Sequence, residues 1–424
     1  MTAVIGILNK QGIALAADSA VTVTGGNQKK IYNTANKIFT LSKYHPVSIM
    51  IYSSSAFMQT PWEIIIKLYR KELKDTQFNT IEDYKNDFIK FLKSNDFFTT
   101  EEGQLSYISS FIYWNLKNIK NGILNKLPND KNGADLITEF IKLLKEELES
   151  VIESYNGNKN ILKNFSDYTF DNFKSYIELE IKKMCKIIFD DVELSDDIIE
   201  LIIKQYYSML ISTNFFGNES GLVFAGFGEK EIYPALVSVN IAEVFDNRIR
   251  YFDNRNVKIS DDNNGSIMPF AQTDVIDMFI TGIDPNMDNT YLSIFKKTLE
   301  KYHSFIAESI KEVNNELSEK IANLSIDDVT DEFIKELNKV KRELQITPTV
   351  DTVSILSKED LSEMAESLIY LTYLKRRISS SEESVGGPID VAILSKGDGF
   401  IWKKRKHYFS QELNKHFMAN YFNK

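Results

Sequence analysis

The sequence predicts an α+β fold, with one β-core built from the two ends and the centre of the chain. Three observations predict it. Short apolar runs typical of strands lie near both ends and around residues 221–252. The long stretches between them have helical periodicity instead. The strand-like runs are apolar on both faces and do not alternate, which indicates sheets that are covered on each side.

The first strands are predicted to form two hairpins. Residues 3–8 (AVIGIL) and 12–17 (GIALAA) are short apolar runs joined by a polar turn. Residues 36–41 (NKIFTL) and 47–52 (VSIMIY) repeat this pattern. The N-terminal part of the chain is therefore expected to supply four strands, paired in two hairpins.

The first helical block starts near residue 57. In residues 134–152, apolar side chains recur at i, i+4, i+7 and i+8 with Lys and Glu between them, which is typical of an amphipathic helix. Short clusters of Asn, Asp and Gly separate the helices. The other stretches of this kind are 62–74, 80–93, 104–126, 169–189 and 195–213.

The second half of the chain repeats the order of strands and helices. Central strands are predicted at 221–226, 232–241 and 247–252. Helical stretches are predicted at 271–283, 289–343 and 358–377. The closing strands, 388–395 and 400–405, flank a Lys-Gly-Asp-Gly turn that is typical of a hairpin.

Composition excludes several classes of protein. The 424 residues are 43% hydrophobic and 26% charged, as in an ordinary globular chain. The 50 Lys and Arg against 60 Asp and Glu leave a net charge of -10, which argues against nucleic-acid binding. No apolar run approaches the roughly 20 residues that cross a bilayer, so we expect no membrane association. With no targeting segment at the N-terminus, the sequence predicts a cytoplasmic protein.

Few residues are available for metal or thiol chemistry. Four His and a single Cys argue against a zinc site, an internal disulfide and Cys–His catalysis. An oxygen-ligand site for Mg²⁺ or Ca²⁺ is not excluded by composition. Cys185 lies on an apolar helical face, which favours core packing. We expect neither a metal nor an organic cofactor.

The start of the chain carries the strongest candidate for chemistry. Met1 is followed by Thr2, and a second residue this small predicts removal of the methionine. Thr2 would then have a free α-amino group with a reference pKa of about 7.7–8.0 beside its hydroxyl. Such a residue serves as nucleophile and base together, and no histidine is needed.

Two charged residues strengthen this interpretation. Asp18 ends the strand paired with the one that Thr2 opens, and Lys37 begins the next strand. In an antiparallel meander these three positions converge at one end of the sheet. The Lys37 ammonium would then stabilise negative charge on the attacking oxygen, and Asp18 would hold that ammonium in place. The alternative is that Asp18 and Lys37 are ordinary surface charges at strand ends.

These residues resemble a known family. Segments 2–6 (TAVIG), 12–19 (GIALAADS) and 36–39 (NKIF) look like the opening of proteasome β-subunits and the bacterial HslV-type peptidases, within the N-terminal nucleophile (Ntn) hydrolases. Segment 385–393 (VGGPIDVAI), followed by 397–399 (GDG), looks like the family's late glycine turn, strand and closing hairpin. The helical blocks lie outside the resemblance.

The resemblance implies roles for individual residues. Thr2 would be the nucleophile, supported by Asp18 and Lys37, and the backbone N–H of Ser54 would form the oxyanion hole. Glu382 would replace the Asp that supports the amine in the family, and Ser384 would supply a hydroxyl through a one-residue shift. A second supporting Ser of the family has no clear counterpart, and Gln272 lies at the corresponding place.

The resemblance also implies a four-layer αββα Ntn-hydrolase sandwich with two large helical insertions. Its discontinuous core would consist of residues 1–57, 215–285 and 355–410. Residues 58–214 would form the first insertion, whose start is the first core helix, and 286–354 the second. Residues 411–424 would be a C-terminal tail.

The expected function is hydrolysis of peptide bonds through an acyl-enzyme on Thr2, without metal or cofactor. The expected partner is a peptide or protein substrate. The sequence also leaves a homo-oligomer of this chain open. Two alternatives stay open. One is a non-peptide amidohydrolase, and the other is a catalytically silent scaffold whose helical insertions bind a partner.

Overall fold

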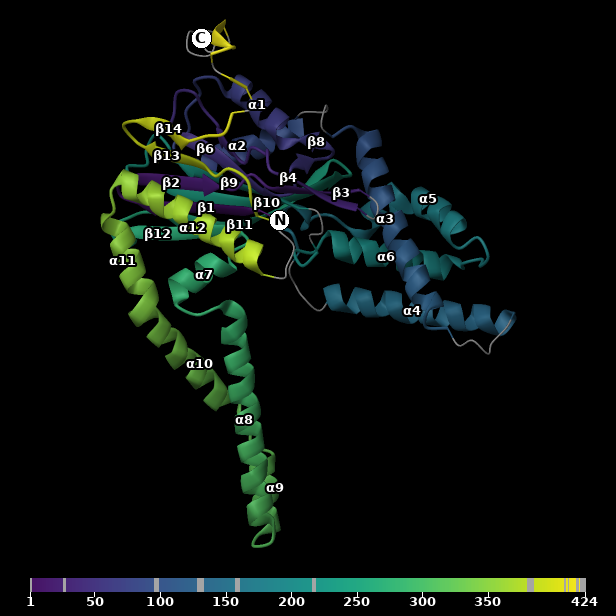
Figure 1. The fold of residues 1–424 in the computed structure, drawn as a ribbon. Helices are drawn as coiled ribbons and strands as arrows, with labels where there is room; N and C mark the ends of the chain where they lie inside the picture. Colours follow the sequence, from purple (N-terminus) through teal and green to yellow (C-terminus); the bar gives the residue numbers. More distant parts are fainter. Residues whose placement is uncertain are drawn as a thin grey trace.

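The computed structural model describes residues 2–25, 28–94, 99–127, 133–156, 161–215, 219–379, 385–407, 409–410, 412–416 and 419. The predicted α+β class is confirmed. Two five-stranded antiparallel sheets form the centre of the molecule, and helices surround them (Figure 1).

The first sheet has the strand order β12-β1-β2-β13-β14. Its strands are β1 (Ala3–Asn9), β2 (Gly12–Ala17), β12 (Gly265–Ala271), β13 (Asp390–Ser395) and β14 (Gly399–Lys404). Strand β12 was missed by the sequence analysis, which predicted a helix from residue 271. Pro269 within it argues against a strand, and it is tolerated here because β12 is an edge strand, where one row of N–H groups needs no partner.

The second sheet has the order β11-β10-β9-β6-β5. Its strands are β5 (Ile38–Thr40), β6 (Val47–Ser53), β9 (Ser220–Gly226), β10 (Ala235–Phe245) and β11 (Arg248–Lys258). Two smaller hairpins were not predicted. They pair β3 (Val21–Gly25) with β4 (Gln28–Tyr32) and β7 (Ala56–Phe57) with β8 (Thr60–Pro61).

Three apolar clusters hold the sheets and their helices together. Residues such as Leu8 and Leu236 form a core between the two sheets. The outer face of the second sheet packs on α1 (Trp62–Leu73) and α2 (Ile81–Ser94), with Trp62 fully buried. The outer face of the first sheet packs on α7 (Asp274–Thr281), α11 (Thr347–Ile355) and α12 (Lys358–Ile378). Both faces of each sheet are therefore covered, as the apolar strands predict.

The remaining helices lie outside this centre. Helices α3 (Glu101–Leu124), α4 (Ala134–Asn156), α5 (Phe170–Ile188) and α6 (Asp196–Leu210), with a 3-10 turn at Lys163–Phe165, pack around a core of their own. Helices α8 (Pro285–Lys311), α9 (Asn315–Ala322) and α10 (Asp327–Lys341) form an arm that projects from the sheets (Figure 1). A π-helical turn, Arg342–Ile346, joins the arm to α11.

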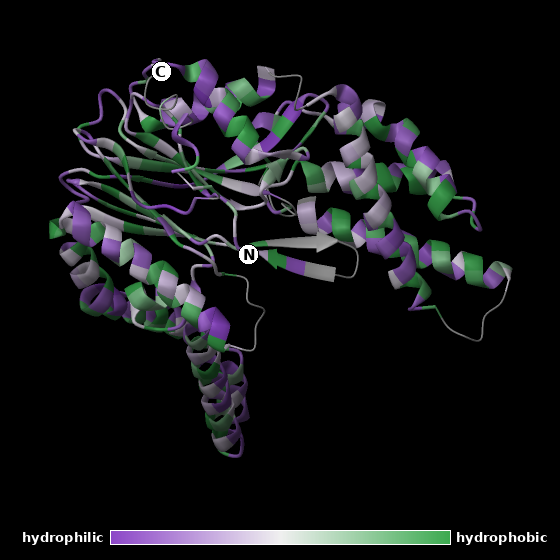
Figure 2. Ribbon diagram, turned by 45° about the horizontal axis from the view of Figure 1, so that its top comes forward, coloured by the Kyte–Doolittle hydropathy of each residue, from purple (hydrophilic) through white to green (hydrophobic). Residues whose placement is uncertain are grey.

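The helices are amphipathic, and none of those in the described part of the chain is long and apolar enough to cross a membrane. Hydrophobic residues gather along the strands of the two sheets, whereas the arm alternates polar and apolar residues along its length (Figure 2). The division of the chain into a discontinuous core, two insertions and a tail stays a prediction.

Candidate active site at the start of strand β1

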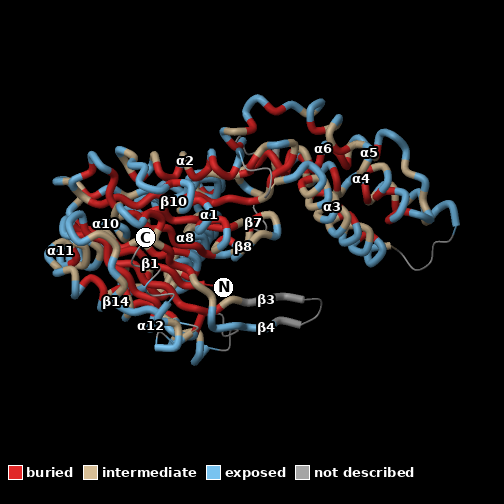
Figure 3. Tube along the Cα trace, turned by 90° about the horizontal axis from the view of Figure 1, so that it is seen from above, coloured by how far each residue is buried: buried red, intermediate tan, exposed pale blue. Residues whose placement is uncertain are grey.

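Thr2 lies immediately before β1. Figure 3 marks the N-terminal end of the chain beside the buried strands of the sheets. Its exposed fraction is 4%, so the residue is buried. The carbonyl oxygen of Thr2 accepts a hydrogen bond from the backbone N–H of Gln272, with an N–O distance of 3.1 Å. The β1–β12 ladder therefore continues one residue beyond the strand and fixes the backbone of Thr2.

Asp18 follows β2 and turns its carboxylate back toward the start of β1. Its Oδ1 accepts from the N–H of Ala3 at 2.9 Å and from the Lys37 ammonium at 2.6 Å. Its Oδ2 accepts from the N–H groups of Ala20 and Gly386, each at 3.1 Å. One carboxylate thus joins β1, β2 and the segment before β13 to the Lys37 side chain.

Lys37 stands directly before β5 and reaches across from the second sheet to Asp18. Both side chains are buried. Burial lowers the pKa of Lys37 below its ordinary value of 10.5, and the Asp18 carboxylate opposes that shift. The alternative of surface strand-end charges is therefore wrong for both residues, because the pair lies inside the protein, between the ends of the two sheets.

A second ion pair lies near the first. Asp390, the first residue of β13, accepts from the backbone N–H of Lys406 at 2.9 Å and is bonded to the Lys406 ammonium. Both side chains are largely buried. Asp390 and Lys406 act electrostatically on Lys37 in opposite directions. The sequence analysis named neither residue as part of the site.

Ser54 follows β6 in the second sheet. Its backbone N–H donates to the carbonyl oxygen of Glu219 at 3.2 Å, and its hydroxyl donates to the carbonyl oxygen of Ala56 at 3.0 Å. The preceding residue, Ser53, has φ 64°, a left-handed conformation that is uncommon for residues with a side chain. The predicted oxyanion donor is therefore already engaged with Glu219.

The two other predicted site residues, Glu382 and Ser384, lie outside the described residues. The chain is described again from Val385, which is buried. Gly386 then donates its N–H to Asp18 and accepts through its carbonyl from the N–H of Ser19 at 3.0 Å. The segment that follows the predicted pair is thus held against Asp18.

Gln272 is joined to a residue that the sequence analysis did not consider. Its side-chain oxygen accepts from Nε of Arg376 in α12, and the same guanidinium is paired with Asp274 at the start of α7. No local sequence pattern marks Arg376, because 104 residues separate it from Gln272. Only the packing of α12 on the first sheet brings them together.

The described residues include no group of three or more His, Cys, Asp or Glu side chains that could hold a metal ion. Cys185 is buried in the apolar core shared by α3 to α6, and burial raises the pKa of its thiol to about 12. A thiol that stays protonated at neutral pH is a poor nucleophile. Its packing role, expected from the sequence, agrees with this position.

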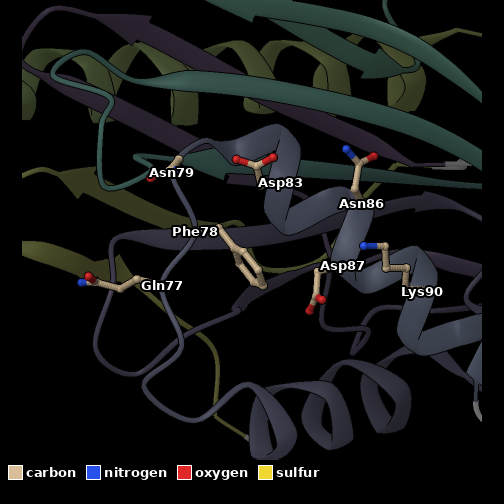
Figure 4. Close-up of a pocket in the computed structure, with 7 residues that line it drawn as sticks. All are labelled: Gln77, Phe78, Asn79, Asp83, Asn86, Asp87 and Lys90. Carbon is tan, nitrogen blue, oxygen red and sulfur yellow. The ribbon is translucent and has the colours of Figure 1, made fainter.

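A surface pocket of about 390 Å³ lies at the start of α2, and no residue of the candidate site lines it (Figure 4). Its carboxylates have structural partners. Asp83 accepts from the backbone N–H and the hydroxyl of Thr80, at 3.0 and 2.8 Å. Asp87 accepts from the Tyr69 hydroxyl at 2.8 Å, and burial raises the pKa of that tyrosine. We therefore assign no chemistry to this pocket.

Among known proteins, only solved structures are similar to this chain in the comparisons made. No family model matches the chain, and no curated protein matches it. Similar solved structures include the Anbu complex from Pseudomonas aeruginosa, described as a helical assembly, with 8% identity over 99% of this chain and 94% of that chain and a TM-score of 0.28. Anbu, or ancestral beta-subunit, from Yersinia bercovieri has 9% identity over 99% and 95% and a TM-score of 0.30. Anbu from Hyphomicrobium sp. strain MC1 has 9% identity over 100% and 97% and a TM-score of 0.29.

These findings correct the family resemblance inferred from the sequence. The sequence analysis identified the chain with the Ntn hydrolases through proteasome β-subunits and HslV-type peptidases, and this identification is wrong. No family model matches the chain, and the similar structures named here are Anbu proteins. Identities of 8–9% and TM-scores of 0.28–0.30 are too low to support an argument about family or function.

Proposed function

We propose that this chain is a threonine hydrolase that cleaves amide bonds in peptides through an acyl-enzyme ester on Thr2. The observation that carries the proposal is the buried Lys37–Asp18 pair. Its carboxylate also receives the N–H of Ala3, the residue directly after Thr2. A buried charge pair is costly and therefore calls for a reason, which a reaction at Thr2 would supply. The proposed framework is a four-layer αββα sandwich.

The proposed reaction needs Met1 removed. The free α-amine of Thr2 accepts the hydroxyl proton while Oγ1 attacks the carbonyl carbon of the substrate. The tetrahedral intermediate collapses to an ester on Oγ1, and the leaving amine takes the proton. Water, activated by the same amine, hydrolyses the ester and restores Thr2. The Lys37 ammonium provides positive charge where the oxygen develops negative charge.

The oxyanion needs a hydrogen-bond donor as well. In the proposal this donor is the N–H of Ser54, which must share or release its bond to the Glu219 carbonyl. Ser53, the residue before this donor, has a left-handed backbone conformation. Such uncommon conformations cluster at functional sites. Glu382 and Ser384 stay predicted supports of the amine, and a homo-oligomeric state stays a prediction.

One observation favours a second candidate function. The backbone N–H of Ser54, the proposed oxyanion donor, is already bonded to the carbonyl oxygen of Glu219. A catalytically silent scaffold, whose helical insertions bind a partner, needs no free oxyanion donor. The same experiment separates this candidate from the hydrolase.

The test combines intact mass with active-site labelling. The purified protein is weighed to establish its first residue, and it is then treated with an epoxyketone that forms a ring with an N-terminal threonine. We expect loss of Met1 and one adduct per chain in the wild type and in Thr2→Ser. Thr2→Ala is expected to give no adduct, because it lacks the nucleophilic oxygen.

Three results would count against the hydrolase. Retention of Met1 would leave no free amine at Thr2, and an adduct that persists in Thr2→Ala would place the reactive group elsewhere. A wild-type protein without Met1 that forms no adduct would favour the scaffold. If the adduct forms, peptide libraries and small amides as substrates distinguish the peptidase from a non-peptide amidohydrolase.

A further inference from the structure

The guanidinium of Arg376 connects the last turns of α12 with the turn between β12 and α7. Its Nε donates to the side-chain oxygen of Gln272, and a terminal nitrogen is paired with Asp274. Gln272 is buried and the Arg376 side chain is 19% exposed, so water competes little for these bonds. A planar guanidinium bonds two groups through a rigid fork, whereas an ammonium on a flexible stem does not fix their relative geometry.

The turn that Arg376 holds is also the turn that fixes Thr2. The N–H of Gln272 donates to the carbonyl oxygen of Thr2 at 3.1 Å. The residue before it, Ala271, has φ 65°, a left-handed conformation disfavoured by its Cβ. Backbone in such a conformation persists only where surrounding contacts hold it. Arg376 of α12 supplies two contacts of this kind, to Gln272 and to Asp274.

The neighbouring Lys375 makes a different set of contacts. Its ammonium lies 2.8 Å from Asp284 and 3.5 Å from Asp274. It therefore ties α12 to α7 and the start of α8, without a bond to Gln272 in the described residues. The two adjacent cations have equal charge and comparable surroundings, which makes Lys375 a matched control for Arg376.

We propose that Arg376 is a positioning residue for Thr2, which fixes the Gln272 turn and, through the Gln272 N–H, the backbone from which the Thr2 side chain projects. This role rests on the proposed function of Thr2. A reaction slows steeply when its nucleophile is displaced by about 1 Å from the attacking position. Loss of the Arg376 contacts should therefore slow the reaction of Thr2 without abolishing it.

The experiment compares Arg376→Gln, Arg376→Lys and Lys375→Gln in the full chain. The first readout is the rate constant of epoxyketone labelling at Thr2 against pH. Arg376→Gln is expected to label at least about tenfold more slowly than the wild type. The midpoint of its pH profile should be unchanged, because the variant displaces Thr2 and leaves the pKa of its amine as it was. Arg376→Lys is expected to recover little, and Lys375→Gln to label within about twofold of the wild type.

A double-mutant cycle tests whether Arg376 acts through Gln272. In a Gln272→Ala background, Arg376→Gln should slow labelling by a smaller factor than in the wild-type background, because one of the two contacts of Arg376 with the turn is already absent. Hydrogen exchange gives a readout that needs no activity. The Gln272 amide should exchange about tenfold faster in Arg376→Gln than in the wild type or Lys375→Gln.

Each outcome decides one proposal. If the wild type labels, and Arg376→Gln matches it in both labelling and exchange, Arg376 has no positioning role. A shift in the midpoint of the pH profile, or full recovery in Arg376→Lys, would show that charge matters instead and would also overturn it. If the wild type fails to label, the proposed function fails and the positioning role fails with it, whatever the exchange at Gln272 shows about the turn itself.

Discussion

At the scale of residues, Asp18 is the centre of the site. Its two carboxylate oxygens accept four hydrogen bonds, from Ala3, Ala20, Lys37 and Gly386. A carboxylate that accepts this many hydrogen bonds is held in one orientation. The side chain therefore has a structural role as well as the proposed chemical one, and variants of Asp18 must be assayed for both.

Replacement of Asp18 by Asn should destabilise the fold strongly. The buried Lys37 ammonium would lose its partner, and breaking a buried pair in this way typically costs about 3–5 kcal/mol. Chemical denaturation near neutral pH measures the free energy of unfolding. Asp261→Asn, which removes the partner of the exposed Lys10, is the control and should change little. Equal stability of the two variants would contradict the buried pair.

The loss in Asp18→Asn should also depend on pH. Burial lowers the pKa of Lys37 in the folded state below 10.5, the value expected in the unfolded chain. Between these two values the unfolded state binds more protons, so stability rises with pH. The rise is larger in Asp18→Asn, because no carboxylate opposes the effect of burial. Its deficit against the wild type should therefore narrow as the same denaturation series moves from neutral toward alkaline pH.

At the scale of elements, α12 connects the site to the rest of the molecule. It packs on the first sheet through residues such as Leu361 and Leu368, and its last turns carry Lys375 and Arg376. Its start is fixed by a capping box between Ser357 and Asp360. Because a helix transmits restraint along its length, the cap contributes to holding both ends of α12 in place.

Replacement of Ser357 by Ala should cost about 1 kcal/mol of stability, the usual value of a lost N-cap. The hydroxyl accepts from the N–H of Asp360 at 3.2 Å, and this N–H would lose its partner. Ser354→Ala, one turn earlier in α11, removes only a donor to the Asp351 carbonyl and should be near neutral. Thermal denaturation of both variants measures the difference. A loss in Ser354→Ala as large as in Ser357→Ala would argue against the cap.

At the scale of the whole molecule, the two groups of helices outside the sheets differ in how they contact them. Helices α3 to α6 share their core with Phe245 of β10. The arm formed by α8, α9 and α10 buries almost nothing of its own, since Ala307 is its one buried hydrophobic residue. The ends of the arm lie together, because Lys341 is paired with Asp288. The arm should therefore be separable from the sheets.

Deletion of residues 290–339, with a short Gly/Ser linker in their place, should leave the midpoint of thermal unfolding within about 4 °C of the full chain. Labelling of Thr2, where it occurs, should be unaffected. Deletion of residues 101–210 is the contrasting variant and should destabilise the protein, since it exposes Phe245 and the Arg250 side chain that bonds to the Leu210 carbonyl. Unfolding of the arm deletion at ambient temperature would contradict this picture.

The sequence alone located most elements of this fold. Apolar runs marked β1, β2, β6, β9 and β13, and 3.6-residue periodicity marked the helices, because both signals are local. It missed β12, where Pro269 weakens the strand signal, and the hairpin of β3 and β4. It named Thr2, Asp18 and Lys37 as one group. In the structure, the Asp18 carboxylate accepts hydrogen bonds from the Lys37 ammonium and from the N–H of Ala3, the residue after Thr2.

Only the tertiary structure decided the rest of the site. Gln272 and Arg376 lie 104 residues apart and meet only because α12 packs on the first sheet. Asp390 and Lys406 lie 16 residues apart, and they come near Lys37 because β13 pairs with β2 in the first sheet. The sequence determined which side chains are apolar enough to be buried and where short-range patterns start and end. The burial that turns Asp18 and Lys37 from surface charges into a buried pair is a property of the two packed sheets, because desolvation depends on neighbours that no local pattern specifies.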